Sequence, residues 1–300
     1  RVMWELEVEI RLNFYLALLA RFTADTATQV RTFNERILEI VLIQLREGDI
    51  APLQVKIAEV QAAQAQQAEI AALNNYYAAT RRLAALAGWT EPTLEPRGIL
   101  PDAAQLPPGV DLAALAAGNQ PRLKTLQAAV DHGEAALKLA RRNTVPEPSF
   151  GIYYGRERDA FANVNYNIIL GTITMRIPVW QRNRREKAYA KSNISVVRTE
   201  RDAFAQALPP LTEAAAAAVD AAAKQIDLYE ASIFPSLQSN LELLNKGYEL
   251  GEIDVLQVSL ARERFFAVQT GLMQGYADYV RARADLERIV GVDPFRATPS

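Results

Sequence analysis

The stretch GDIAPLQVKIAEVQAAQAQQAEIAALNNYYAATRRLAALAG, from Gly48 to Gly88, decides the fold because it occurs twice. A shift of 203 positions (251 minus 48) places it without a gap on GEIDVLQVSLARERFFAVQTGLMQGYADYVRARADLERIVG, from Gly251 to Gly291. The copies share 11 identities in 41 positions, more than unrelated helical segments share by chance. Short-period solenoids repeat roughly every 20 to 50 residues, so this spacing predicts two related halves instead.

Both copies carry a seven-residue repeat of apolar and small side chains. The second copy has Val258, Phe265, Leu272, Tyr279 and Leu286, followed three residues later by Ala261, Val268, Gly275, Ala282 and Ile289. The first copy has Val55, Ala62, Glu69, Tyr76 and Leu83, followed by Ala58, Ala65, Ala72, Ala79 and Leu86. Such a repeat predicts left-handed supercoiling, and the mostly small seam position allows close helix approach. An ordinary antiparallel coiled coil explains this seam by itself.

The composition excludes several classes of function. The 300 residues suffice for one large domain or two ordinary ones. The 33 basic and 35 acidic residues nearly balance, and the basic ones form no single block, so we expect no nucleic-acid partner. Cysteine is absent, which excludes disulfides, thiolate metal sites and cysteine nucleophiles. His132 is the only histidine, which excludes histidine-rich metal sites and a catalytic pair with a second histidine. We expect no metal site and no cofactor.

The start of the chain lacks the usual signals of a helix beginning or a leader. No run of 18 or more apolar residues predicts a membrane-spanning helix, and no signal-peptide pattern is present. The helical period is already established at Trp4 and Leu6, with no Ser, Thr, Asp or Asn before it as a cap. We therefore expect the natural N-terminus to precede Arg1.

Breaker residues divide the chain into six segments. Gly48-Asp49 ends the first helix, six prolines from Pro92 to Pro121 exclude a long helix there, and Pro209-Pro210 and Pro235 interrupt a later one. The predicted segments are a first helical hairpin over 1–88, an irregular segment over 89–121 with a short helix near 112–117, a helix over 122–148, a β-hairpin over 149–180, a second helical hairpin over 181–291 and a tail over 292–300.

The β-hairpin is predicted from a change of period from helical to two. Phe150, Ile152 and Tyr154 alternate with smaller or polar residues, and a charged loop with Glu157 and Asp159 follows. In the second strand Ile169, Gly171, Ile173, Met175 and Ile177 share one face, and Leu170, Thr172, Thr174 and Arg176 share the other. Each strand has roughly 10 residues, the length that crosses a bilayer when tilted.

An isolated hairpin with such an apolar face is marginal in water and leaves unpaired edges. A bilayer tolerates strands only in a closed barrel, so several chains would have to contribute to one. The alternative is that the apolar face packs on the helices of its own chain.

Three motifs carry a resemblance to a known family. They are GYELGEIDVL at Gly247 to Leu256, NQPRL at Asn119 to Leu123, and IPVWQRNR at Ile177 to Arg184. Each is short, but their order around a duplicated hairpin resembles the TolC-like outer membrane efflux proteins over nearly the whole chain, closest to the heavy-metal efflux (CzcC-like) branch. The resemblance implies a mainly α fold in which long antiparallel coiled-coil hairpins in two repeated halves form a trimeric α-barrel, with a β-hairpin contributing to a transmembrane β-barrel.

The resemblance also implies a function without catalysis. Such a chain is a passive exit duct in the bacterial outer membrane that extends into the periplasm. Its expected partners are two further copies in a homotrimer, a periplasmic adaptor, an inner-membrane pump reached through the adaptor, and outer-membrane lipid. The family has two strand pairs per chain and only the second is predicted here, so the first would precede Arg1. Heavy-metal cargo rests on the family branch alone.

The family's functional positions can be placed on matching residues of this sequence. Adaptor docking at the periplasmic tip falls on Gly48, Asp49, Gly251 and Glu252, and the pore gate falls on Asp254 and Gln257. The lipid-facing strand positions are Ile169, Ile173, Met175 and Ile177, and the barrel lumen positions are Thr172, Thr174 and Arg176. For Asp254 a cap of the last helix is the plainer role, and the two roles can coexist.

Two other functions remain open from the residues. The first is a soluble coiled-coil scaffold or periplasmic adaptor, which would need no detergent, whereas a duct would need it. The second, an enzyme, has little support, because Glu157 and Asp159 lack a nucleophile and base around them.

Overall fold

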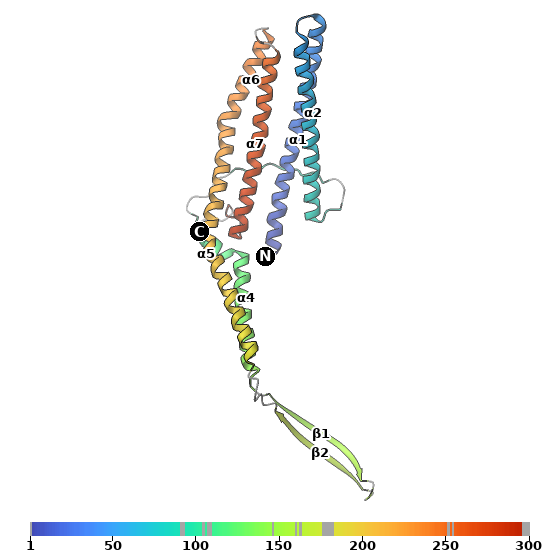
Figure 1. The fold of residues 1–300 in the computed structure, drawn as a ribbon, viewed down its shortest axis with the longest axis vertical. Helices are drawn as coiled ribbons and strands as arrows, with labels where there is room; N and C mark the ends of the chain where they lie inside the picture. Colours follow the sequence, from blue (N-terminus) through green and yellow to red (C-terminus); the bar gives the residue numbers. More distant parts are fainter. Residues whose placement is uncertain are drawn as a thin grey trace. The chain divides into compact units, whose positions relative to one another are not determined.

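A computed structural model describes residues 2–90, 94–103, 106, 110–145, 147–159, 161, 164–175, 183–250, 253 and 255–295. The chain divides into two compact units (Figure 1). Unit 1 comprises residues 1–120 and 207–300, and unit 2 comprises residues 121–206. Helices dominate the structure, as the sequence predicts.

The first two helices of unit 1 form the predicted hairpin. Helix α1 spans Val2–Glu47 and helix α2 spans Pro52–Ala87, and they pack on each other. Gly48 has φ +85°, a backbone conformation that glycine adopts without cost. The amides of Gly48 and Asp49 donate to the carbonyls of Leu45 and Gln44, which ends α1. Pro52 is the first residue of α2, where its missing N–H leaves no helical bond unmade.

The duplication is visible in the helix bounds. Helix α7 spans Val255–Val290, and both it and α2 have 36 residues. Their first residues differ by 203 positions (255 minus 52), and so do their last (290 minus 87). Gly88 at φ +66° and Gly291 at φ +81° follow the two helices in the left-handed conformation of a C-terminal cap. The repeat therefore specifies the same helix with the same end signal in both halves.

The predicted coiled-coil seam is buried. Val55 and Ala58 of α2 pack in one cluster with Ile37 and Val41 of α1. Buried seam residues of the first copy are Val55, Ala58, Ala65, Ala72 and Leu83, and those of the second are Val258, Leu272, Gly275, Tyr279 and Leu286. Glu69, the one charged seam residue, is neutralised by Arg31 of α1, with Nε to Oε2 at 2.7 Å.

The second hairpin contains helix α5 (Arg184–Leu228), a π-helical turn η1 (Tyr229–Ile233), helix α6 (Phe234–Glu249) and α7. The predicted interruption near Pro235 is confirmed, because the Phe234 amide donates to the carbonyl of Tyr229, five residues back. Proline has no N–H and its ring clashes with the carbonyl four residues earlier, so the widened turn accommodates it.

The predicted interruption at Pro209-Pro210 is wrong. Helix α5 continues through both prolines. Each proline removes only one backbone hydrogen bond, and the neighbouring Leu208 and Thr212 are buried on either side. The Thr212 hydroxyl also donates to the Pro209 carbonyl at 2.7 Å. Packing on both sides therefore keeps the helix continuous.

Unit 1 places its long helices in a row. Helix α1 packs on α2 and α7, and α7 packs on α6, so the order is α2, α1, α7, α6 (Figure 1). The main core joins Leu19 of α1, Ile226 of α5 and Tyr279 of α7. Helix α3 (Leu112–Asn119) packs on α7, and the Asp111 carboxylate caps it by accepting from the Ala114 amide at 2.9 Å.

A buried ion-pair network fastens the end of α7 to α1. Glu287 is 1% exposed, and its carboxylate accepts from Arg11 at 2.8 Å and from Arg283 at 3.0 Å. Asp293 lies 3.2 Å from Arg283 and 3.6 Å from Arg11, and the Arg283 guanidinium stacks 4.4 Å from the ring centre of Phe295. Burial raises the pKa of Glu287, although the Arg283 hydrogen bond acts against it. The arginines and carboxylates therefore form one interdependent group.

Unit 2 contains a helix pair and the β-hairpin. Helix α4 (Pro121–Arg142) packs antiparallel on the first half of α5, and a Cβ on Gly133 would lie 2.8 Å from Ile194 Cγ1. Strand β1 (Pro148–Asp159) pairs antiparallel with strand β2 (Val164–Met175). The predicted loop with Glu157 and Asp159 is wrong, because β1 continues to Asp159. The added length is supported by a cross-strand hydrogen bond from Arg156 Nε to Asn167 Oδ1 at 3.1 Å.

Candidate membrane strands and hairpin tips

One face of the β-hairpin is apolar and exposed. The register pairs Phe150 with Ile173, Ile152 with Gly171, and Tyr154 with Ile169, and directly opposed residues share a face. Ile152 is 87% exposed, Phe150 and Ile169 are 75% exposed, and Ile173 is 73% exposed. Within unit 2, this face therefore does not pack on the helices α4 and α5.

The apolar face has a defined length. It begins at the pair Pro148–Met175 and ends after Tyr154–Ile169, because the next pair on that face is Arg156–Asn167. Six steps of about 3.4 Å give roughly 20 Å along the strand. The lipid-facing band of membrane β-barrels is roughly 25 Å tall. The length of the apolar face is therefore similar to the thickness of the lipid-facing band.

On the opposite face of the hairpin, the side chains next to Pro148 and Met175 are smaller and more polar. It contains the pairs Ser149–Thr174 and Gly151–Thr172, and the Thr172 hydroxyl donates to the Gly151 carbonyl at 3.3 Å. The register therefore separates Thr172 and Thr174 from Ile169, Ile173 and Met175 as the period of two predicts. Their assignment to lumen and to lipid stays a prediction. Arg176 and Ile177 lie outside the described residues.

The tip of the first helical hairpin presents two exposed residues, Gly48 and Asp49. The next residue, Ile50, turns inward and packs against the cluster of Ile37, Val41, Val55 and Ala58. The docking role of Gly48 and Asp49 stays a prediction, and the geometry adds that Ile50 fixes the backbone from which they project.

The tip of the second hairpin is partly described. Gly251, Glu252 and Asp254 lie outside the described residues, and Gln257 is exposed in the first turn of α7. Ile253 packs over Gly247, where an added Cβ would lie 2.5 Å from Ile253 Cδ1. Ile50 and Ile253 occupy matching positions of the repeat, so the duplication in the sequence is the signal that identifies both anchors.

The described residues contain no helix that combines the length and the apolar character needed to span a membrane. They also contain no cluster of three or more His, Cys, Asp or Glu side chains suited to hold a metal ion.

Comparison with known proteins identifies relatives of the whole chain. The profile of the family described as "Outer membrane efflux protein" matches residues 112–292. The cobalt-zinc-cadmium resistance protein CzcC of Cupriavidus metallidurans is 21% identical over 291 residues, which cover 97% of this chain and 68% of that protein.

Solved structures share the fold. The Campylobacter jejuni CmeC outer membrane channel superposes with a TM-score of 0.77 at 14% identity, over 96% of this chain and 62% of that one. The open state of the Neisseria gonorrhoeae MtrE outer membrane channel gives a TM-score of 0.71 at 16% identity, over 99% of this chain and 68% of that one. This chain thus spans less than two thirds of the length of CmeC.

Proposed function

Because the chain belongs to the outer membrane efflux protein family, we propose that it is the outer-membrane channel component of a tripartite efflux system. It is a passive duct and not an enzyme, located in the bacterial outer membrane and extending into the periplasm. The observation that carries the proposal is the exposed apolar face of β1 and β2, whose length matches a bilayer core.

Assembly into a homotrimer is supported by the unpaired ends of the helix row in unit 1 and by the unpaired edges of the β-hairpin. The helix row of unit 1 ends at α2 and α6, and α2 exposes Leu53, Ile57 and Val60 on one side. A two-stranded sheet likewise has two unpaired edges, which lipid does not tolerate. Further copies of the chain close both: helices of three subunits form an α-barrel, and their strands form a transmembrane β-barrel.

The remaining partners belong to the two ends of this tube. A periplasmic adaptor docks at the hairpin tips, on Gly48, Asp49, Gly251 and Glu252, and connects the duct to an inner-membrane pump. Outer-membrane lipid surrounds the strands through Ile169, Ile173, Met175 and Ile177, while Thr172, Thr174 and Arg176 line the water-filled lumen. The relative named for cobalt, zinc and cadmium resistance supports heavy-metal cations as the cargo.

Electron microscopy of the detergent-purified protein tests the assembly. We expect a threefold tube whose particles disperse only with detergent, because the strand face needs an apolar partner in place of water. A monomer that stays dispersed in plain buffer would instead identify a soluble scaffold and exclude the duct.

The gate is tested by Asp254→Ala in planar bilayers. Three copies of Asp254 and Gln257 would form a weakly negative ring at the periplasmic tip, so removal of the carboxylate should raise single-channel conductance or weaken block by divalent cations. Glu242→Ala removes an exposed carboxylate from α6 and serves as the matched control. A record for Asp254→Ala that equals the control would remove Asp254 from the gate and leave it a helix cap.

A further inference from the structure

Two short runs of basic residues lie on either side of the β-hairpin in the chain. Helix α4 ends at Arg142, only six residues before β1 begins at Pro148, and α5 begins at Arg184 after β2. Six residue steps reach at most about 22 Å, so the helix ends stay near the start of the apolar band. We call seven residues of these two helix ends the basic belt: Lys138, Arg141, Arg142, Arg184, Arg185, Lys187 and Lys191.

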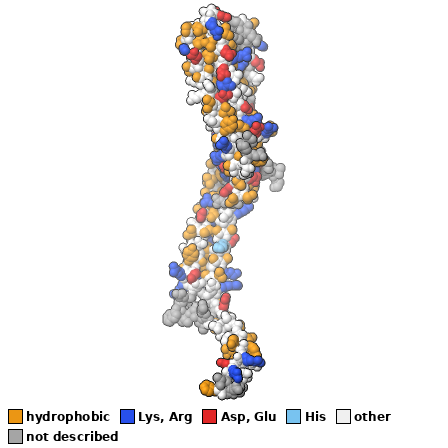
Figure 2. Space-filling model, turned by 90° about the vertical axis from the view of Figure 1, so that its right-hand side faces the viewer, with side chains coloured by type: hydrophobic (Ala, Val, Ile, Leu, Met, Phe, Trp, Pro, Cys, Tyr) orange, Lys and Arg blue, Asp and Glu red, His pale blue; other side chains and the backbone are white. Residues whose placement is uncertain are grey.

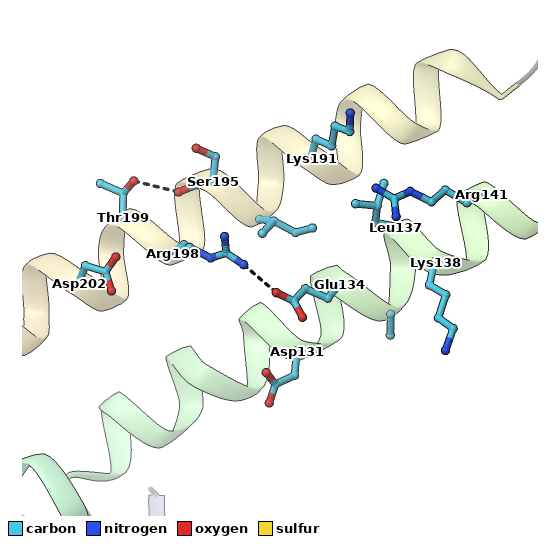
Figure 3. A pocket seen from close by; sticks show the side chains of 12 residues that line it. Asp131, Glu134, Leu137, Lys138, Arg141, Lys191, Ser195, Arg198, Thr199 and Asp202 are labelled. Atoms are coloured by element: carbon cyan, nitrogen blue, oxygen red, sulfur yellow. Dashed lines mark hydrogen bonds and ion pairs between the residues drawn. The ribbon is translucent and has the colours of Figure 1, made fainter.

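The fold brings the two runs together although they are far apart in sequence. Asn183, immediately before α5, donates from Nδ2 to the Ala140 carbonyl of α4 at 3.2 Å. In Figure 3, Lys138 and Arg141 of α4 and Lys191 of α5 line the same end of the groove between the two helices. The belt is therefore one surface, which explains why the sequence shows no single basic block.

The charges of the belt are unpaired within the described part of the chain. Farther along the same helix pair, Arg198 binds Glu134 at 2.7 Å and Arg122 binds Glu200 at 3.3 Å. None of the seven belt residues makes an ion pair with a described residue. Within the two helix ends, residues 138–142 and 184–191, the sequence has one acidic residue, Glu186. Figure 2 shows Lys and Arg side chains on both sides of this region. An unneutralised positive surface favours an anionic partner.

Apolar side chains stand among these charges. Tyr189 is 75% exposed, Val145 is 66% exposed and Leu139 is 60% exposed. Exposed tyrosine beside Lys and Arg is the composition found where a membrane protein meets the headgroup layer. The long basic side chains can lay their methylene stems along the apolar surface and extend their charges to phosphates.

We propose that the basic belt binds the anionic headgroups of phospholipids in the leaflet that faces the helices. The inference rests on the proposed function, because it places the apolar band of the strands in the bilayer. The phosphates then lie at the end of that band, where Arg142 and Arg184 flank the strands. The belt fixes the depth of the duct in the membrane and selects phosphatidylglycerol-like lipids over zwitterionic ones.

Lipid retention by the reconstituted trimer tests the belt. We would place the protein in nanodiscs of phosphatidylcholine with a minority of phosphatidylglycerol, extract it gently and measure the bound lipids by native mass spectrometry. Each basic residue near an anionic surface contributes up to about fivefold in binding, so the combination Arg141→Gln, Arg142→Gln, Arg184→Gln and Arg185→Gln should lower phosphatidylglycerol enrichment at least about tenfold. Raised salt should weaken the wild-type enrichment.

A matched variant controls for the loss of four charges. Arg36, Arg46, Arg81 and Arg264 are exposed in unit 1 and make no described ion pair, so their replacement by Gln should leave the enrichment unchanged. Equal enrichment in the belt variant and the wild type would overturn the proposal, and so would displacement of the lipid by inorganic phosphate. A wild type that fails to insert even into phosphatidylcholine would overturn the duct itself, whereas insertion without enrichment would overturn only the belt.

Discussion

Ile152→Lys should prevent most of the protein from reaching the outer membrane as the proposed trimer. Ile152 lies near the centre of the apolar band and is 87% exposed, so the proposed duct would place it against the bilayer core. A lysine facing lipid near the midplane costs roughly 2–4 kcal/mol per strand, and each subunit of the proposed trimer would bear this cost. The measurement is the trimer fraction in purified outer membranes, with urea-driven unfolding in lipid vesicles to obtain the free energy.

Thr172→Lys is the control for this substitution. Thr172 pairs with Gly151, next to the pair of Ile152 with Gly171, and its side chain lies on the opposite face of the hairpin. If that face lines the lumen, the new charge stays in water and the trimer assembles with altered ion selectivity. Equal loss of assembly in both variants would show that neither face meets lipid in the proposed way.

Glu287→Ala should lower the free energy of unfolding by about 3 kcal/mol. Removal of one partner from a buried ion pair costs roughly 3–5 kcal/mol, because the charge that remains is uncompensated. Here Arg11 and Arg283 both lose a carboxylate, but Asp293 stays within 3.6 Å and 3.2 Å of them, which places the effect at the lower end. Denaturant unfolding followed by circular dichroism of the purified protein measures the loss.

Two further variants separate charge from packing at this position. Burial raises the pKa of Glu287, so the folded chain binds that proton more tightly than the unfolded chain, and the neutral side chain is the less costly one to bury. Glu287→Gln should therefore destabilise less than Glu287→Ala. Asp285→Ala removes an exposed carboxylate of the same helix, whose one ion-pair partner among the described residues is Arg288 at 3.0 Å, and should cost about 0.5 kcal/mol or less. Equal effects of Glu287→Ala and Asp285→Ala would refute the role of the network.

Local patterns of the sequence were sufficient for much of the fold. The repeat between Gly48 and Gly88 and its second copy predicted two helices that prove to have the same length and the same glycine caps. The period of two from Ile169 to Met175 predicted which residues share a strand face. Such patterns are reliable because a helix seam or a strand face is set by spacing along a single element.

Features that depend on distant residues could not be predicted in this way. The ion pair of Arg11 with Glu287 joins residues 276 positions apart. The sequence around either residue contains no signal that predicts this contact. The continuity of α5 through Pro209 depends on the burial of Leu208 and Thr212, and the extension of β1 depends on Asn167 across the ladder. The basic belt likewise exists only once α4 and α5 lie side by side.

The π-helical turn at Tyr229–Ile233 changes the direction in which the side chains of the second hairpin point. A turn closed over five residues instead of four inserts one extra residue into an otherwise regular helix. Side chains beyond it are thereby rotated by about 100° from the positions that α5 would extrapolate, since 3.6 residues make a full turn. The side chains of α6 that pack on α7 are therefore not in helical register with the side chains of α5 that enter the core. The two helices change register at this turn, with no loop between them.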